Sequence, residues 1–238
     1  MKALPFPCIR PVPEHAADLA SRSPRSLQTR EDVRRLIEDG ALVEDRNLGY
    51  YLYELTQGGH AYSGIVAVCS LDEYASEAIS AGGPDPDEDA VREELEHLRA
   101  CGCQTQPVIL AHPDQPVLDM IAGAAKTSAA LYVLENGAGD RQTVWEVTRR
   151  EAVDALHAML AQLPTARICG GHAHLEAAAR MAREQREEAQ RAGTLTGKEP
   201  FNYVLGILIP QSQAEALERG PHGATLPLGA LFAHRIAK

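Results

Sequence analysis

The segment that most constrains this chain is residues 166–182, where an apolar stretch ends at two glycines and a long helix is predicted to begin at once. The sequence at the junction is Gly170-Gly171-His172-Ala173-His174, and the predicted helix runs to about Ala192. Glycine lets the backbone approach a ligand, and a helix N-terminus offers free N–H groups and the positive end of a dipole. We therefore predict a site for phosphate or another anion at Gly170, Gly171, His172 and His174. The alternative is a tight turn whose histidines only cap the helix.

Length and composition set the scale of the fold. The chain has 238 residues, of which 45% are hydrophobic and only 5% aromatic, with a single Trp. Ala, Leu and Val must therefore fill most of a sizeable core, in one large domain or two small ones. We predict a single domain over 1–238. A subdivision at the glycine- and proline-rich segment 81–87 is the alternative.

The net charge limits the classes of molecule that this protein can bind, and the cysteines indicate its cellular compartment. A formal net charge of −10 disfavours DNA and RNA, because their binders need clustered Lys and Arg against phosphates. A bound nucleotide needs only a local positive site. No apolar run is long enough to cross a membrane, and proline interrupts the N-terminus too early for a signal peptide. Five cysteines suit a reducing cytoplasm. We expect a cytoplasmic protein with a small-molecule ligand; the oligomeric state is not readable.

Strand and helix patterns alternate irregularly along the chain. A β-hairpin is predicted from residues 50–55 and 62–69, with its turn at 57–60, and a second from 131–135 and 143–148 across 136–140. Helices are predicted near 14–22, after Thr29 as N-cap with Asp32 as its partner, and from Ser70. The other helices are predicted at 88–100, 117–125 and 150–163. Further strands are predicted at 108–110, at 201–209 and within 229–236. This mixture lacks a regular βαβ repeat and predicts an α+β protein with a mixed sheet and flanking helices.

The chain resembles a known family in several segments that occur in the family's order. These are Pro5-Phe6-Pro7-Cys8-Ile9-Arg10-Pro11, Leu36 to Asp45, Tyr51-Leu52-Tyr53, Gly58-Gly59-His60, Gly64-Ile65-Val66, Asp72-Glu73-Tyr74 and Gly197-Lys198-Glu199-Pro200-Phe201-Asn202-Tyr203. They resemble the family known as domain of unknown function 1015. That family is distantly similar to the ParB/sulfiredoxin fold, which includes free-serine kinases. The resemblance implies a ParB/sulfiredoxin-like core in a shortened, diverged member.

The resemblance also implies a phosphate loop at the glycine–histidine segment, with ATP or ADP and Mg²⁺ as cofactors. The family signature there is Asp-Gly-His-His-Arg. Gly171 and His172 match it, whereas Gly170 stands for the Asp, Ala173 for the second His and His174 for the Arg. The Arg would bring a permanent charge and a planar fork of donors that His lacks.

Other family residues are also missing. No acid occurs within 21–27, where the family has Pro-Tyr-Asp, and neither His nor Glu occurs within 78–83, where it has His-Glu-x-Thr. The family's Lys-Ser-Thr aligns with Gly223-Ala224-Thr225, without the Lys.

Two carboxylates are candidates for acid–base chemistry. Glu176 lies in the first turn after the glycines, and Glu199 precedes the strand predicted at 201–209. A kinase acting on a hydroxyl needs such a base near it, with Mg²⁺ on the phosphates. Asn202 matches the family and is a candidate ligand-binding residue. A solvated or capping role for both carboxylates, and a structural hydrogen bond for Asn202, are the alternatives.

No metal site is predicted. His172 and His174 would point the same way if both stood in a strand, with Cys169 near them, and His97, Cys101 and Cys103 form another loose group. Neither group shows the paired ligand spacing of a zinc site.

Two functional hypotheses follow. One is a diverged member that binds a small phosphate-containing or anionic ligand at the glycine–histidine loop with reduced or lost catalysis. The other is an active ATP- or ADP-dependent phosphotransferase acting on serine or a similar small hydroxyl compound. The residues missing from the signature favour the first.

Overall fold

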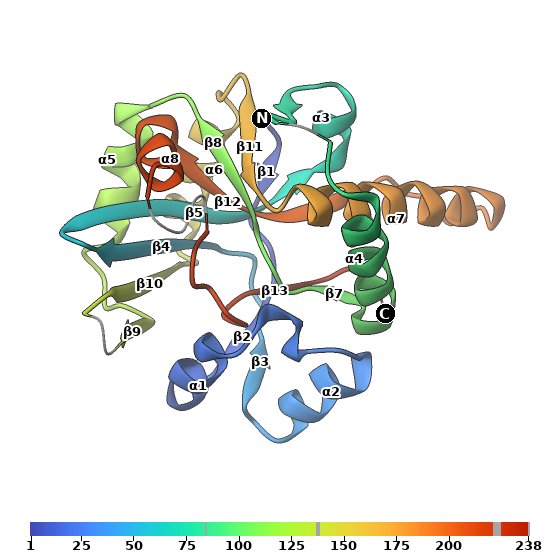
Figure 1. Ribbon diagram of the computed structural model, residues 1–238, viewed down its shortest axis with the longest axis horizontal. Helices are drawn as coiled ribbons and strands as arrows, with labels where there is room; N and C mark the ends of the chain where they lie inside the picture. The colour runs from blue at the N-terminus through green and yellow to red at the C-terminus, as the bar shows by residue number, and fades with distance from the viewer. Residues whose placement is uncertain (84, 137–138, 221–224, 238) are drawn as a thin grey trace.

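The computed structural model describes residues 1–83, 85–136, 139–220 and 225–237. Its centre is a long antiparallel hairpin of β4 (Tyr50–Gln57) and β5 (His60–Ser70) (Figure 1). The turn falls at Gly58 and Gly59, whose φ angles of 58° and 79° lie in the left-handed region that glycine adopts without strain. The first predicted hairpin is therefore confirmed.

Among the described residues, a mixed sheet of nine strands is built around this hairpin. Its order is β6-β11-β8-β12-β5-β4-β10-β9, and β1 (Ala3–Leu4) also pairs with β5. Two pairs, β6–β11 and β8–β12, are parallel and the other described pairs are antiparallel. The strand bounds are β6 (Ile79–Ser80), β8 (Val108–His112), β9 (Tyr132–Glu135), β10 (Arg141–Val147), β11 (Ala166–Gly170) and β12 (Tyr203–Pro210).

The second predicted hairpin is also present, as β9 paired with β10. Gly137 and Ala138, within its predicted turn, lie outside the described residues.

A second, antiparallel sheet joins distant parts of the chain. Its order is β3 (Leu42–Glu44), β2 (Cys8–Pro11), β13 (Ala233–Arg235) and β7 (Cys103–Gln104). Beside it lie α1 (Ala16–Ser21), α2 (Arg30–Glu38) and the short 3-10 turns η1 (Pro13–His15) and η2 (Pro24–Ser26). The molecule is thus α+β as predicted, but with two sheets where one was expected. The extra sheet was missed because its strands are only two to four residues long.

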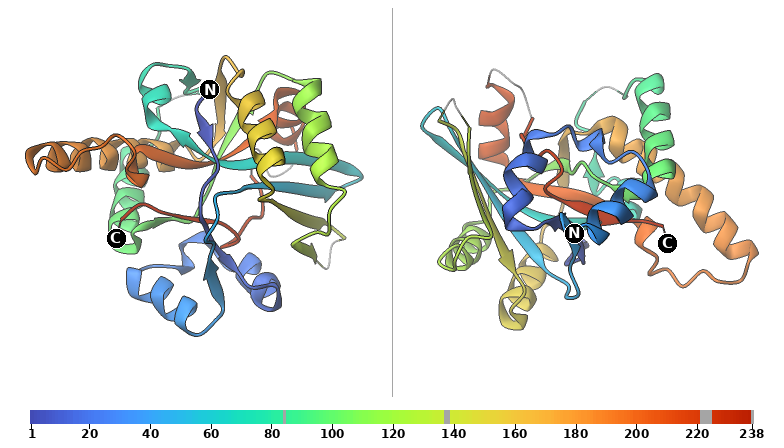
Figure 2. Two further views of the ribbon diagram at one scale, coloured as in Figure 1. Left: turned by 180° about the vertical axis from the view of Figure 1, so that it is seen from behind. Right: turned by 90° about the horizontal axis from the view of Figure 1, so that it is seen from below.

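Helices cover both faces of the large sheet (Figures 1 and 2). On one face, the apolar sides of α4 (Glu88–Cys101), α5 (Pro116–Ala125), α6 (Arg150–Leu160) and α7 (His172–Arg191) belong to the core cluster that includes Tyr50 and Leu52. On the other, α8 (Gln211–Glu218) and the segment 226–232 pack with Tyr51 and Tyr53. Alternate residues of β4 therefore enter two different cores, because successive strand residues point to opposite faces.

Local sequence signals account for several helix ends. Thr29 and Asp32 form the predicted capping box at the start of α2, and Gly40 follows its end with a φ of 74°. The remaining short elements are α3 (Leu71–Ala75), whose N-cap is Ser70, and η3 (Pro200–Asn202). None of the helices in the described ranges is long and apolar enough to cross a membrane.

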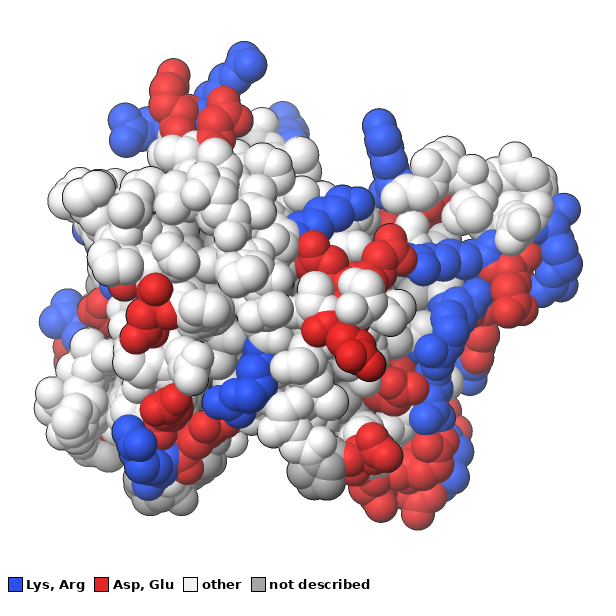
Figure 3. All heavy atoms as spheres, turned by 90° about the horizontal axis from the view of Figure 1, so that it is seen from above, with Lys and Arg blue, Asp and Glu red and all other residues white. Residues whose placement is uncertain are grey.

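The longest helix, α7, is buried at its beginning and exposed at its end. Its twenty residues span about 30 Å. Its apolar residues up to Ala182 contribute to the core, whereas most residues after Ala182 are exposed. Figure 1 shows the final turns projecting beyond the sheet. Along one side of the face in Figure 3, acidic and basic side chains are intermingled, and ion pairs such as Arg180–Glu176 lie on α7.

The segment predicted as a linker, 81–87, lies between β6 and α4, and Pro84 within it is outside the described residues. Strands from both sides of it enter the large sheet. The single domain over 1–238 and the alternative subdivision both stay predictions.

Candidate functional site

The glycine–histidine segment forms a sharp turn from β11 into α7. Gly170 ends the strand, and Gly171 is the N-cap of the helix with φ 84° and ψ 27°. A Cβ on Gly171 would lie 3.2 Å from both Cα and Cγ1 of Val108 in the adjacent strand β8. Glycine is therefore required at position 171 for two reasons: the left-handed conformation and the close approach of a neighbouring backbone.

The first turn of α7 carries no side-chain cap. Gly171 has no side chain to offer, and the first turn holds no acidic residue. The first N–H groups of a helix have no partner within it and carry the positive end of its dipole. Residues 170–173 are half-buried, so this end of the helix is neither fully open nor sealed. Such an end suits an anion.

His172 links the turn to the segment that follows β6. Its Nε2 lies 2.9 Å from the carbonyl oxygen of Ala81. In the same segment, a Cβ on Gly82 would come within 2.7 Å of the carbonyl oxygen of Ile168. The segment predicted as a linker therefore packs directly on the glycine turn. Because Nε2 of His172 is near Ala81, Nδ1 is the ring nitrogen that is left to contact a ligand.

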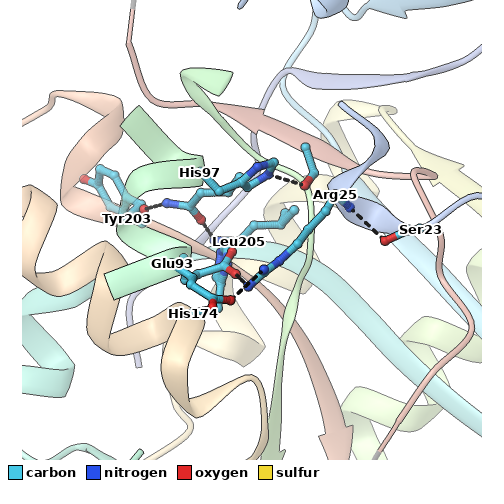
Figure 4. A network of polar contacts seen from close by, with 10 residues as sticks. Ser23, Arg25, Glu93, His97, His174, Tyr203 and Leu205 are labelled. Atoms are coloured by element: carbon cyan, nitrogen blue, oxygen red, sulfur yellow. Dashed lines mark hydrogen bonds and ion pairs between the residues drawn. The ribbon is translucent and has the colours of Figure 1, made fainter. Parts of the chain in front are cut away.

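His174 points away from the turn into the protein. Only 3% of it is exposed, and its Nδ1 lies 2.7 Å from Oε1 of Glu94 on α4. The other oxygen of Glu94 accepts a hydrogen bond of 2.7 Å from Arg25 of η2. Figure 4 shows Arg25 and His174 in this network of polar contacts. Nε2 of His174 is buried with no hydrogen-bond partner among the described residues. The structure thus uses His174 to join α7, α4 and the N-terminal region.

The Glu94 carboxylate stays ionised in this network. Burial alone raises the pKa of this carboxyl, but hydrogen bonds and charges from His174 and Arg25 outweigh that effect and lower the pKa to about 2. One carboxylate therefore holds two donors from different elements. Sequence reasoning missed both Glu94 and Arg25. A signal for Glu94 was present, because it occupies a place in the buried stripe of α4 that Val91, Leu98 and Cys101 otherwise fill.

The two histidines are not placed to share a metal. The strand geometry considered for them is wrong, because His172 and His174 are the first and third residues of α7. Residues two apart on a helix point to different sides. In the other group, His97 lies 3.5 Å from the hydroxyl of Thr105, while Cys101 and Cys103 are buried. Within the described ranges, no group of three or more His, Cys, Asp or Glu side chains could hold a metal ion.

Glu176, one of the two predicted catalytic carboxylates, is the fifth residue of α7 and so lies just after the first turn, in which it was predicted. It accepts hydrogen bonds from Nε of Arg180 at 2.9 Å and from the hydroxyl of Tyr74 at 3.2 Å, and Arg183 lies 3.5 Å away. Two cations and a phenol therefore surround this carboxylate, and its catalytic role stays a prediction.

Glu199 and Asn202 lie at a different place, near the second half of α7. Glu199 accepts hydrogen bonds from Thr196 and Asn202, and these bonds hold the pKa of its carboxyl near 2. Arg186 of α7 donates to Oδ1 of Asn202. Arg186 stands ten residues after Glu176, about 15 Å along the helix. The structure therefore brings Gly170, Gly171, His172 and Glu176 near one another, turns the side chain of His174 inward, and separates all of them from Glu199 and Asn202.

A large cavity lies on the side of Glu199. It has a volume of about 1020 Å³, and none of the residues 170–174 lines it. Sequence reasoning missed it, because its walls come from the two ends of the chain and the segment before β12. Gly223 and Ala224, compared above with the family's Lys-Ser-Thr, lie outside the described residues.

These features define an α+β protein in which a glycine turn leads from a strand into the uncapped start of a long helix. A family model described as Protein of unknown function (DUF1015) matches residues 7–217, and the chain belongs to this family. The match confirms the resemblance seen in the sequence. No curated protein and no solved structure matches the chain.

Proposed function

We propose that this protein binds a small phosphate-containing or otherwise anionic ligand at the start of α7, and that its catalysis is reduced or lost. The observation that carries the proposal is the left-handed Gly171, which opens a twenty-residue helix whose first turn has no side-chain cap. Free N–H groups and the helix dipole at such a place favour a phosphate. His172, half-buried beside them, is the side chain best placed to add a hydrogen bond.

We propose ATP or ADP, with Mg²⁺, as the first candidate ligands of this site. The described residues offer no ready metal cluster, but Mg²⁺ typically arrives with nucleotide phosphates and needs only one or two carboxylates from the protein. Glu176 is the nearest predicted carboxylate. The residues therefore fit a phosphate better than they fit a resident metal.

The state of the two carboxylates supports reduced catalysis over an active phosphotransferase. A general base works best when its pKa is close to the working pH. The pKa of Glu199 is far below neutrality, and this residue lies well away from the turn. Glu176 is already engaged by Arg180 and Tyr74. His174, in the place of the family's Arg, faces Glu94 and brings no positive fork to the turn.

The test is calorimetric titration of the full chain with ATP, ADP and inorganic phosphate, with and without Mg²⁺. We expect at least one of them to bind, and His172→Ala to weaken binding about tenfold, the effect of one hydrogen bond to a charged group. His15→Ala, an exposed histidine of η1, is the matched control and should bind as the wild type does.

Two outcomes would overturn parts of the proposal. If none of the three anions binds the wild type, the site at α7 is wrong. If an anion binds and phosphate is then transferred to free serine in a turnover assay, the loss of catalysis is wrong and the phosphotransferase hypothesis holds.

A further inference from the structure

The cavity of about 1020 Å³ is separate from the glycine turn. Three segments form most of its wall: residues 2–7, residues 196–203 and residues 234–237. The first and last are near the two ends of the chain, and Figure 2 shows both running beside the segment that leads into β12. Gln185 of α7 also lines the cavity and follows His172 by thirteen residues, about 20 Å along the helix. A ligand here would not touch the start of α7.

Most of the wall is apolar. Its main side chains are Leu4, Phe6, Val68, Phe201, Tyr203 and Ile236. A concave apolar surface of this volume is typical of sites for small organic molecules, which gain free energy from the apolar area they remove from water. The wall therefore favours a ligand with an aliphatic or aromatic body.

Two lysines give the cavity positive charge without carboxylate partners. Nζ of Lys2 lies 5.2 Å from the ring centroid of Tyr203, and Lys198 follows the end of α7. In the described part of the chain, no carboxylate forms an ion pair with either side chain. Both residues line the cavity and are exposed to solvent.

The other charged residues of the wall already have partners. Arg235 and Glu44 pair with each other at 2.8 Å, and Glu199 is held by Thr196 and Asn202. Nε2 of His234 lies 3.1 Å from the carbonyl oxygen of Pro200, and burial lowers the pKa of this imidazole to about 4. His234 is therefore neutral at pH 7, and the lysines are the only cations of the described wall that lack a carboxylate partner.

We propose that this cavity binds a small amphipathic anion, with its apolar body against Phe6, Phe201 and Tyr203 and its carboxylate or phosphate group at Lys2 and Lys198. The two lysines complement the charge of an anion locally, in a chain whose net charge is −10. The cavity needs no contribution from the glycine turn, so this site stands or falls independently of the proposed function.

The experiment compares three probes of equal chain length by calorimetry: decanoate, decyl phosphate and decanol. We expect at least one of the two anions to bind the full chain with a one-to-one stoichiometry and at least tenfold more tightly than decanol. The two anions separate a carboxylate site from a phosphate site. Saturating ADP should leave the binding of the anion unchanged, because the two sites are about 20 Å apart along α7.

Variants locate the binding. Ala237→Trp places a large side chain in the cavity at a half-buried position near the chain end and should abolish binding of all three probes. Lys198→Ala should weaken the anions about tenfold and leave decanol unchanged. Arg219→Ala, which removes an exposed positive charge at the end of α8, is the matched control and should change nothing.

Three results would overturn the proposal. Failure of both anions to bind the wild type would show that no such site exists. Equal affinities for decanol and the anions would show that the lysines do not bind the anionic group of the ligand. Unchanged binding by Ala237→Trp, with its fold verified by circular dichroism, would place the ligand outside this cavity.

Discussion

Gly171 determines how closely β11 and α7 can approach β8. The contribution of this residue to stability can be measured with a single substitution. Gly171→Ala adds a Cβ at 3.2 Å from the Val108 backbone, in a conformation that L-residues avoid. Gly193→Ala shares the positive φ, 67°, but its Cβ would meet nothing within 4 Å. We expect Gly193→Ala to cost about 1 kcal/mol in urea unfolding, and Gly171→Ala at least about 1 kcal/mol more. Equal losses would mean that the contact with Val108 relaxes freely.

Glu94 makes the free energy of unfolding depend on pH in the acidic range. The pKa of this carboxyl is about 2 in the folded chain against an ordinary value of 4.5. A lowered folded-state pKa adds stability that is fully present above the ordinary value and is lost as the pH falls toward 2. The shift corresponds to about 3 kcal/mol. Glu94→Gln should therefore unfold more easily than the wild type at pH 7, with a difference that shrinks below about pH 4.5.

A neighbouring carboxylate provides the control for that comparison. Glu93 also pairs with Arg25, at 3.4 Å, but its side chain is 65% exposed. Exposed pairs contribute little to stability, so Glu93→Gln should follow the wild-type pH profile. A difference between the wild type and Glu94→Gln that stays constant down to pH 2 would contradict the assigned role of Glu94.

The residues of the turn were predictable, whereas their partners were not. Gly171 and His172 follow from a local pattern, since a strand that ends at glycine before a helix is readable over a few residues. The partner of His174 is eighty positions away in sequence, and Arg25 is sixty-nine positions from Glu94. No local pattern indicates that η2, α4 and α7 meet, so the inward orientation of His174 needed the three-dimensional arrangement.

Among the elements, β7 connects the two sheets through one side chain. Nε2 of Gln104 donates to the carbonyl oxygen of Tyr203 at 2.9 Å, and Oε1 accepts from the N–H of Leu205. Gln104 is 1% exposed, so both backbone groups of β12 would be left buried without partners in Gln104→Leu. We expect that variant to lose about 2–4 kcal/mol in urea unfolding. Gln162→Leu, on the surface after α6, should change stability by less than about 0.5 kcal/mol.

Whether a helix or strand could be predicted depended on how far along the sequence its pairing or packing partners lie. The β4–β5 hairpin was found because its two glycines and both strands are adjacent in sequence. The small sheet was missed because β2 pairs with β13, more than two hundred residues later, and its strands are too short to show a period of two. α8 was also missed, since only Ala214 and Leu217 of it are buried.

At the scale of the whole molecule, charge sets what the surface can attract. The net charge is −10, and basic side chains such as Arg180 and Arg99 are paired with carboxylates. We expect no binding to a fluorescent 20-base-pair DNA duplex in anisotropy titrations at 150 mM salt, because such binding depends on releasing counterions with unpaired cations. An affinity that falls linearly with the logarithm of the salt concentration would contradict this expectation.

The position of β13 between β2 and β7 has a consequence for synthesis on the ribosome. One edge of β2 cannot pair until residues 233–235 have emerged. At a typical elongation rate of about 5–20 residues per second, that edge stays open for roughly 10–45 s. During this interval the β4–β5 hairpin can already form, while β2 presents unpaired N–H and C=O groups that another chain could meet. A strand that is made late therefore completes the pairing of one that is made early.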